Sequence, residues 1–250
     1  MDAYTGFAAV YDQFMNNVPY EEWAAFLAEL LQEHGIAGGL LLELGCGTGT
    51  MTEQMAARGY DMIGIDSSEN MLAEAMDKRA ESGLDILYLC QDMRAFELYG
   101  TVAAIYSICD SLNYILDYAA LVQVFRLANN YLDPKGILLF DFNTAAAYRD
   151  PLRQVPIVET ADGDTMIWEN CYDEDSRINE HRITFFLEEE DGLYSRIEEL
   201  HRQRAYSLKE IRCALKEAGL IYLTAFGEGT RQAPGQDTAR IYIIARENGK

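Results

Sequence analysis

The sequence predicts an α/β fold built on a mostly parallel, doubly wound sheet of seven strands, with a small antiparallel β-meander inserted near the C-terminal end. Three observations predict it. Short apolar runs alternate with segments of helical periodicity through the first 145 residues. A turn with three alternating glycines follows the first apolar run. Alternation with a period of two residues then replaces the helical pattern over residues 155–206.

The first element of the main domain is a helix over residues 19–34, because apolar side chains recur at helical spacing between Pro19 and Gly35. Strands and helices then alternate along the chain. We expect strands at 40–44, 61–65, 85–90, 102–108 and 137–141, helices at 50–57, 68–82 and 118–131, and a turn at 133–136. Such alternation indicates a parallel sheet with helices on both faces.

The insertion comes next, with turn signals at 162–163, 173–176 and 191–192. Its expected strands are 155–160, 165–172, 177–189 and 193–204, which are too long and too polar for a simple crossover loop. A capping box from Ser207 to Glu210 opens a further helix that ends at Gly219, and strands at 220–226 and 239–246 close the sheet. The predicted main domain is therefore residues 1–150 and 207–250, and residues 151–206 form a substrate-covering insertion.

The composition and net charge of the chain limit the classes of partner, metal site and cellular location that we expect. The chain has 250 residues, 49% of them hydrophobic, enough for one large core. Its net charge of −21 would repel a polyphosphate, so we expect a small-molecule partner and not a nucleic acid. Five cysteines without a C-x-x-C pair predict free thiols and no metal site. No apolar run approaches the length of a membrane span and no secretory signal opens the sequence, so we expect a cytoplasmic monomer or homodimer.

The glycine turn has the pattern E-x-G-x-G-x-G over residues 43–49. A dinucleotide fingerprint would need its third glycine at position 50, where Thr50 stands. The pattern resembles the first motif of class I S-adenosylmethionine (SAM) dependent methyltransferases, which have a Rossmann-like fold and release S-adenosylhomocysteine. The resemblance implies that Glu43 anchors the turn or the ammonium group of SAM. It also implies that the turn itself lies against the amino-acid part of SAM, through Gly45, Cys46, Gly47 and Gly49.

Two acidic residues follow the next strands. Asp66 ends the second strand, where a carboxylate can accept hydrogen bonds from both ribose hydroxyls, and Ser67 and Met71 are assigned to the same site. Nicotinamide enzymes use the same device, so Asp66 alone does not separate SAM from NAD; its alternative role is helix capping. By the resemblance, Asp92 accepts from the adenine amino group and Met93 lies against the ring.

Residues 107–114 follow the fourth strand and resemble the string that small-molecule methyltransferases place between cofactor and acceptor. The resemblance implies that Cys109 lines the SAM pocket and that Tyr114 faces the acceptor. We expect Asp110 to accept a proton or hold a substrate amine, and Asn113 to orient the acceptor. The alternative is a loop capped by its own Asp and Ser side chains.

The N-terminal segment resembles the F-A-x-x-Y-D element of many bacterial methyltransferases, where it forms a lid over SAM. Tyr4 and Tyr11 are therefore predicted cofactor contacts, and Tyr11 also a catalytic residue, since aromatic faces attract a sulfonium. The alternative is a segment that only docks on the core through Phe7, Val10 and Phe14.

Acceptor contacts are expected from Asn143 at the end of the fifth strand, from Trp168 and Tyr172 in the insertion, and from Arg240, which could bind a carboxylate or only cap the sheet edge. His181 and His201 are further candidates for acceptor recognition, although a lone histidine in a strand is more often structural than catalytic.

The sequence thus predicts a SAM-dependent methyltransferase that acts on an amine or hydroxyl of a small molecule. The alternatives are an RNA methyltransferase and a SAM-binding protein without catalysis. A nicotinamide-dependent oxidoreductase is disfavoured by Thr50 and Asp92.

Overall fold

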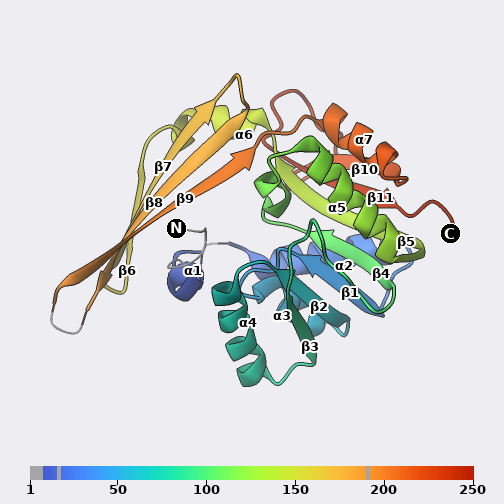
Figure 1. The fold of residues 1–250 in the computed structure, drawn as a ribbon, viewed down its shortest axis with the longest axis horizontal. Helices are drawn as coiled ribbons and strands as arrows, with labels where there is room; N and C mark the ends of the chain where they lie inside the picture. Colours follow the sequence, from blue (N-terminus) through green and yellow to red (C-terminus); the bar gives the residue numbers. More distant parts are fainter. Residues whose placement is uncertain (1–7, 16–17, 190–191) are drawn as a thin grey trace.

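The computed structural model describes residues 8–15, 18–189 and 192–250 of the chain and contains two separate sheets (Figure 1). The larger sheet has the strand order β10-β11-β5-β4-β1-β2-β3. Its strands are β1 (Leu40–Leu44), β2 (Asp61–Asp66), β3 (Ile86–Cys90), β4 (Val102–Ser107), β5 (Leu132–Asn143), β10 (Ile221–Gly227) and β11 (Arg240–Arg246). Strands β1 to β5 pair in parallel, and β11 runs antiparallel to both β5 and β10. The predicted fold class is confirmed.

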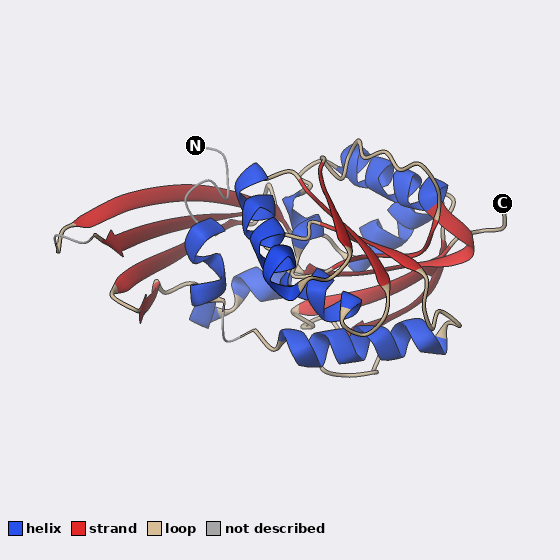
Figure 2. Ribbon diagram, turned by 90° about the horizontal axis from the view of Figure 1, so that it is seen from below, coloured by secondary structure: helices blue, strands red, loops and turns tan. Residues whose placement is uncertain are grey.

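Helices cover both faces of this sheet (Figure 2). The described helices are α1 (Ala8–Phe14), α2 (Tyr20–Glu33), α3 (Thr50–Ala56), α4 (Glu69–Ser82), α5 (Tyr118–Tyr131), α6 (Ala145–Arg149) and α7 (Leu208–Glu217), with 3-10 turns η1 (Ser111–Tyr114) and η2 (Pro151–Arg153). One apolar core lies between the sheet and α5 and α7, and the other lies under α2 and α3. No helix within the described ranges is long and apolar enough to cross a membrane.

The helix ends follow from local sequence. The Ser68 side chain accepts a hydrogen bond from the Met71 amide at the start of α4, and Asp117 caps α5 in the same way. The capping box predicted at Ser207 and Glu210 is present in full. The turn expected at 133–136 is instead part of β5. It appears there as an irregularity, in which Lys135 has a φ of 69° and the register against β4 shifts.

The smaller sheet is an antiparallel meander in the order β6 (Ile157–Ala161), β7 (Asp164–Asp173), β8 (Ile178–Glu188) and β9 (Tyr194–Arg204). The bounds predicted for each of these four strands lie within two residues of the observed bounds. The inner face of the meander has an apolar part, in which Ile183 and Phe185 pack against Val10 and Phe14 of α1. It also has a buried polar part formed by β8 and β9.

The strand order reverses between β1 and β4, because the chain returns from β3 to the other side of β1. Ligands of open α/β sheets bind outside the carboxyl ends of the strands at such a point. The meander and α1 lie beside this end of the sheet (Figure 1), and β9 contacts η1, the turn that follows β4. The fold therefore encloses the predicted site between the main domain and the insertion.

Candidate active site

Two cavities meet at the switch point of the sheet. The larger, of about 640 Å³, lies over the glycine turn and the ends of β1 and β2. The smaller, of about 280 Å³, lies between the meander and the ends of β4 and β5. Tyr11, Cys109 and Tyr114 line both cavities. These three side chains therefore form a wall that is common to ligands in either cavity.

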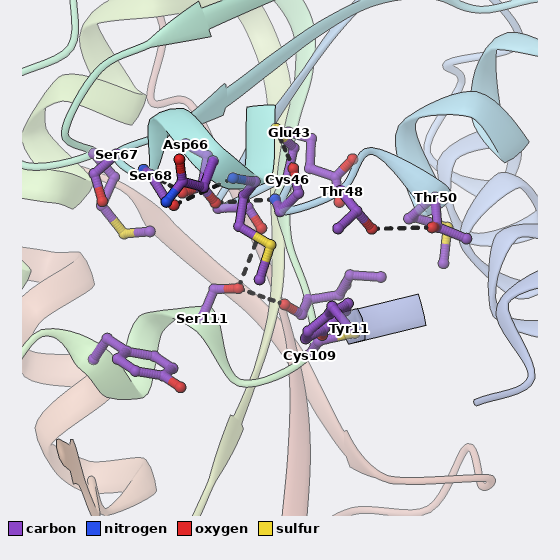
Figure 3. A pocket seen from close by; sticks show the side chains of 18 of the residues that line it. Tyr11, Glu43, Cys46, Thr48, Thr50, Asp66, Ser67, Ser68, Cys109 and Ser111 are labelled. Carbon is purple, nitrogen blue, oxygen red and sulfur yellow. Dashed lines mark hydrogen bonds between the residues drawn. The ribbon is translucent and has the colours of Figure 1, made fainter. Parts of the chain in front are cut away.

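Nearly all of the predicted cofactor residues line the larger cavity (Figure 3). They are Tyr11, Glu43, Gly45, Cys46, Gly47, Asp66, Ser67, Met71, Asp92, Met93 and Cys109. Tyr4 lies outside the described residues. Gly49 does not line the cavity: it precedes α3 with a φ of 75°, and a Cβ there would lie 2.3 Å from the Tyr88 hydroxyl. Gly49 thus shapes the turn and does not contact the cavity.

Gly45 permits a close approach of two chain segments. Its φ is 74°, and a Cβ at this position would lie 2.8 Å from the Cβ of Ser111. Ser111 in turn donates a hydrogen bond to the carbonyl oxygens of Ile108 and, at 3.4 Å, Gly45. The glycine turn is therefore held against the segment that follows β4.

Glu43 is a buried carboxyl in the wall of the larger cavity. It accepts hydrogen bonds from Tyr106, at 3.0 Å, and from Thr52. Burial raises the pKa of Glu43 to about 8, although these hydrogen bonds oppose the shift. A cation that entered this cavity would favour the ionised form.

Asp66 connects the end of β2 to the glycine turn. Its carboxylate accepts from the Gly47 amide at 2.9 Å and from the Ser68 amide at 2.8 Å. Burial raises the pKa of Asp66 above its ordinary value. The carboxylate lies in the cavity wall, where it has further lone pairs for a ligand's hydroxyl groups.

Asp92 has a partner that the sequence did not indicate. Arg94 donates to both Asp92 carboxylate oxygens, with Nε 2.9 Å from each, and these hydrogen bonds lower the pKa of Asp92. Both residues and Met93 line the larger cavity. The Asp92–Arg94 pair therefore forms the wall where an adenine ring is expected.

Helix α1 is fastened over the glycine turn by Asp12. The Asp12 carboxylate accepts from the Thr48 hydroxyl at 2.8 Å and forms an ion pair with Lys78 of α4. Lys78 also donates to the hydroxyls of Thr48 and Thr50 at 3.0 and 2.7 Å. These contacts connect α1, α4 and the turn, and they place Tyr11 between the two cavities.

Asp110 is part of a buried ionic cluster. Arg240 donates to Asp110 at 2.8 Å and to Asp141 at 2.6 Å, and Gln203 donates to the second Asp110 oxygen at 2.6 Å. The backbone has a φ of 57° at Cys109 and 53° at Asp110, which is uncommon for residues other than glycine. Because both of its oxygens already accept charged or amide donors, Asp110 is better suited to position other groups than to take a proton.

The structure does not bring Asn113 to either cavity. Its amide nitrogen donates to the carbonyls of Asn143 and Arg204 at 2.9 and 2.8 Å, and its amide oxygen accepts from the Asn143 backbone at 2.9 Å. The expected role in orienting the acceptor is therefore replaced by a structural one, because the whole side-chain amide is used to join η1, β5 and β9. Tyr172 also stays outside both linings and stacks on Tyr148 with ring centroids 5.6 Å apart.

The smaller cavity contains the remaining predicted acceptor residues, Tyr114, Asn143, Trp168 and Arg240, together with Asp110. Sequence reasoning missed Trp23, Arg153 and Gln203 in this wall. His181 and His201, which the sequence offered as candidates for acceptor recognition, also line it. His181 of β8 pairs directly with His201 of β9, so strand alternation places both side chains on the inner face. No group of three metal-ligating side chains occurs within the described part of the chain.

Comparison with known proteins agrees with this geometry. A family model described as a methyltransferase domain matches residues 41–136. A protein of Geobacillus sp. (strain WCH70), named "Putative methyltransferase GWCH70_2453", is 34% identical over 98% of this chain and 99% of its own. A crystal structure of a SAM-dependent methyltransferase from Clostridium acetobutylicum superposes with a TM-score of 0.87 at 28% identity, over 99% of this chain and 100% of that one. The chain belongs to the class I SAM-dependent methyltransferases.

A third relative of this methyltransferase has a named acceptor. The dTDP-3-amino-3,4,6-trideoxy-α-D-glucopyranose N,N-dimethyltransferase of Streptomyces venezuelae is 28% identical over 54% of this chain and 56% of its own. The larger cavity fits SAM on structural grounds. Gly47 lines the cavity with open space in front of it, Asp66 presents carboxylate lone pairs, and Glu43 is a buried acid whose ionised form a ligand ammonium group would stabilise.

Proposed function

We propose that this methyltransferase methylates an amine nitrogen or a hydroxyl oxygen of a small polar molecule. The observation that carries the proposal is the second cavity, which has its own walls and shares Tyr11, Cys109 and Tyr114 with the cofactor cavity. When bound, SAM supplies an electrophilic methyl group and leaves as S-adenosylhomocysteine. The residues of the chain bind and orient the two molecules and exclude water, and such positioning accounts for much of the rate in bimolecular reactions.

The walls of the acceptor cavity support a polar acceptor with an N–H or O–H group. The Asn143 amide oxygen is buried in this wall and has no hydrogen-bond partner among the described residues. A buried acceptor of this kind is costly unless a ligand satisfies it. Trp23 and Trp168 add flat apolar surface, and Arg153 adds a cation. The amino-sugar N,N-dimethyltransferase among the relatives acts on a molecule of this general type.

The cofactor contacts complete the proposal. Asp66 binds the ribose hydroxyls, the Asp92 side of the cavity accepts the adenine amino group, and Met93 covers the ring. Glu43 and the glycine turn hold the amino-acid part of SAM. Helix α1, fastened through Asp12, closes the cavity and brings Tyr11 to the methyl group.

An RNA acceptor is disfavoured by the net charge of −21, since RNA-binding proteins rely on basic surfaces to neutralise phosphates. A large negative net charge is better suited to a small acceptor, including a cationic one.

The test is transfer of labelled methyl from SAM into a bacterial extract, which is afterwards separated into small-molecule, RNA and protein fractions. The wild-type protein is expected to label the small-molecule fraction, and the Asp66→Ala variant is expected to label nothing. Label confined to RNA or to protein would refute the proposed acceptor class. Absence of label despite SAM binding would refute the proposal for every acceptor in that extract.

A further inference from the structure

We propose that Tyr114, His201 and Glu199 form a proton relay that accepts the proton of the methyl acceptor. This inference rests on the proposed function and deepens it, because it assigns the base that an amine or hydroxyl acceptor requires. It also replaces Asp110, the base expected from the sequence, and gives His201 a chemical role in place of the structural one.

The relay is a continuous row of hydrogen bonds. The Tyr114 hydroxyl lies 3.0 Å from His201 Nδ1, and His201 Nε2 lies 3.0 Å from Glu199 Oε2. Strand alternation places Glu199 and His201 on the same inner face of β9, and both side chains are almost fully buried. Tyr114 comes from η1, so the row joins the meander to the segment that follows β4.

Glu199 fixes the protonation of the imidazole. An ionised carboxylate only accepts hydrogen bonds, so in the proposed relay His201 donates to Glu199 from Nε2, and Nδ1 presents a lone pair to the Tyr114 hydroxyl. Tyr114 then donates to His201, and in the proposed step its oxygen takes the proton of the acceptor N–H or O–H group. A buried carboxylate beside the ring also stabilises the imidazolium that forms when the proton arrives. Glu199 is thus a positioning residue that acts through His201.

The second histidine of the meander, His181, has different hydrogen-bond partners. His181 lies directly opposite His201 in the β8–β9 register, but its Nδ1 accepts from Trp168 Nε1 at 3.0 Å and its Nε2 lies 2.9 Å from the Gln203 amide oxygen. Burial lowers the pKa of His181 to about 4. The amide nitrogen of Gln203 continues to Asp110, so this second row holds Asp110 and Arg240 in place. The carboxylate at the end of the His181 row, Asp110, already balances the charge of Arg240, whereas the His201 row ends directly on the Glu199 carboxylate.

The location of Tyr114 gives the relay its function. Tyr114 lines both cavities, whereas His201 lines only the acceptor cavity. In the proposed step the acceptor proton passes to the Tyr114 oxygen while the Tyr114 proton passes to His201 Nδ1. The freed lone pair of the acceptor forms the bond to the methyl carbon, and the electron pair of the broken carbon–sulfur bond stays on sulfur. Among the described residues, the titratable groups that face His201 include Tyr114 from η1, Glu199 from β9 and His181 from β8.

Histidine NMR tests the relay without any acceptor. The chain has three histidines, so ¹⁵N-labelled histidine spectra of the S-adenosylhomocysteine complex can be assigned with His34→Gln and His181→Gln variants. We expect neutral His201 with its proton on Nε2. Tyr114→Phe is expected to shift the bare Nδ1 resonance downfield, while it keeps the aromatic ring that lines both cavities. A His201 proton on Nδ1, or an Nδ1 resonance that ignores Tyr114→Phe, would overturn the relay.

Kinetics with the acceptor found in the labelled extract provide the second readout. Tyr114→Phe is expected to lower kcat about 100-fold, a typical contribution of general base catalysis, and to change the KM for SAM much less. Glu199→Gln is expected to lower kcat and to move the acidic limb of the plot of kcat against pH. The control variant His34→Gln, far from the site, is expected to keep the wild-type kcat at each pH. Wild-type transfer together with a Tyr114→Phe kcat within about twofold of wild type would sink the relay but leave the proposed function intact. No transfer by the wild type would overturn both.

Discussion

Glu43 makes the stability of this protein depend on pH in a direction opposite to that of a salt-bridged acid. Its pKa is about 8 in the folded protein, against an ordinary value of 4.5, because the side chain is buried. The stability that the protonated carboxyl contributes is fully present below pH 4.5 and is lost as the pH rises through 8. At 1.36 kcal/mol per pH unit, this difference corresponds to a loss on the order of 5 kcal/mol.

The perturbation is Glu43→Gln, which keeps an oxygen to accept from Thr52 and Tyr106 but cannot ionise. The assay is urea unfolding of the wild type and the variant at pH 5, 6.5 and 8. We expect similar stabilities at pH 5 and a relative gain for the variant that grows to several kcal/mol at pH 8. Comparing the two proteins at each pH cancels the repulsion among the other acidic groups.

Asp61→Asn is the matched control, since it removes an exposed carboxylate from the start of the neighbouring strand β2. Its stability is expected to run parallel to that of the wild type across this pH range. If the free-energy difference between Glu43→Gln and the wild type is the same at all three pH values, the reasoning about the buried carboxyl is refuted.

Further predictions concern the cofactor cavity. SAM binding is expected to release a proton from Glu43 near pH 7, because the ammonium group of the ligand favours the ionised carboxylate. Calorimetry of SAM binding in buffers of different ionisation enthalpy measures the number of protons released, and the Glu43→Gln variant should release none. Asp66→Asn is expected to weaken SAM binding by roughly 100-fold, since hydrogen bonds to a charged group contribute about 1.5–3 kcal/mol each; an unchanged Kd would contradict the ribose assignment. Lys78→Met is expected to raise the Kd about tenfold and to expose α1 to proteolysis, and a wild-type cleavage rate would show that the Asp12–Lys78 pair does not hold α1. Gly49→Ala is expected to destabilise the fold by more than 1 kcal/mol in thermal unfolding, and Tyr88→Phe should recover part of that loss by removing the clashing hydroxyl; no recovery would show that the clash with the hydroxyl does not cause the loss.

The sequence was sufficient for the fold and for most of the residues that line the larger cavity, because both depend on local signals. Alternating apolar segments fix the elements, and polar residues at strand ends meet at one edge of a parallel sheet. Asp66 and the glycine turn follow from that rule, and they lie where it predicts.

The contacts that the sequence did not reveal join residues far apart in the chain. Asn113 is satisfied by Asn143 and Arg204, which lie 30 and 91 residues away, so its local setting cannot tell a structural amide from one that faces a ligand. The Tyr114–His201 contact likewise spans 87 residues and depends on how the meander folds back over η1. Acceptor residues are hard to predict from sequence for this reason.

The central claim is that one cavity holds the cofactor and directs its reactive end into the other. A crystal structure with S-adenosylhomocysteine tests it most directly. We predict the adenosine between Asp66 and Met93, and the sulfur beside Tyr11, Cys109 and Tyr114 with an open path into the smaller cavity. A ligand whose sulfur lies away from these three residues, or a ligand bound elsewhere, would contradict the account.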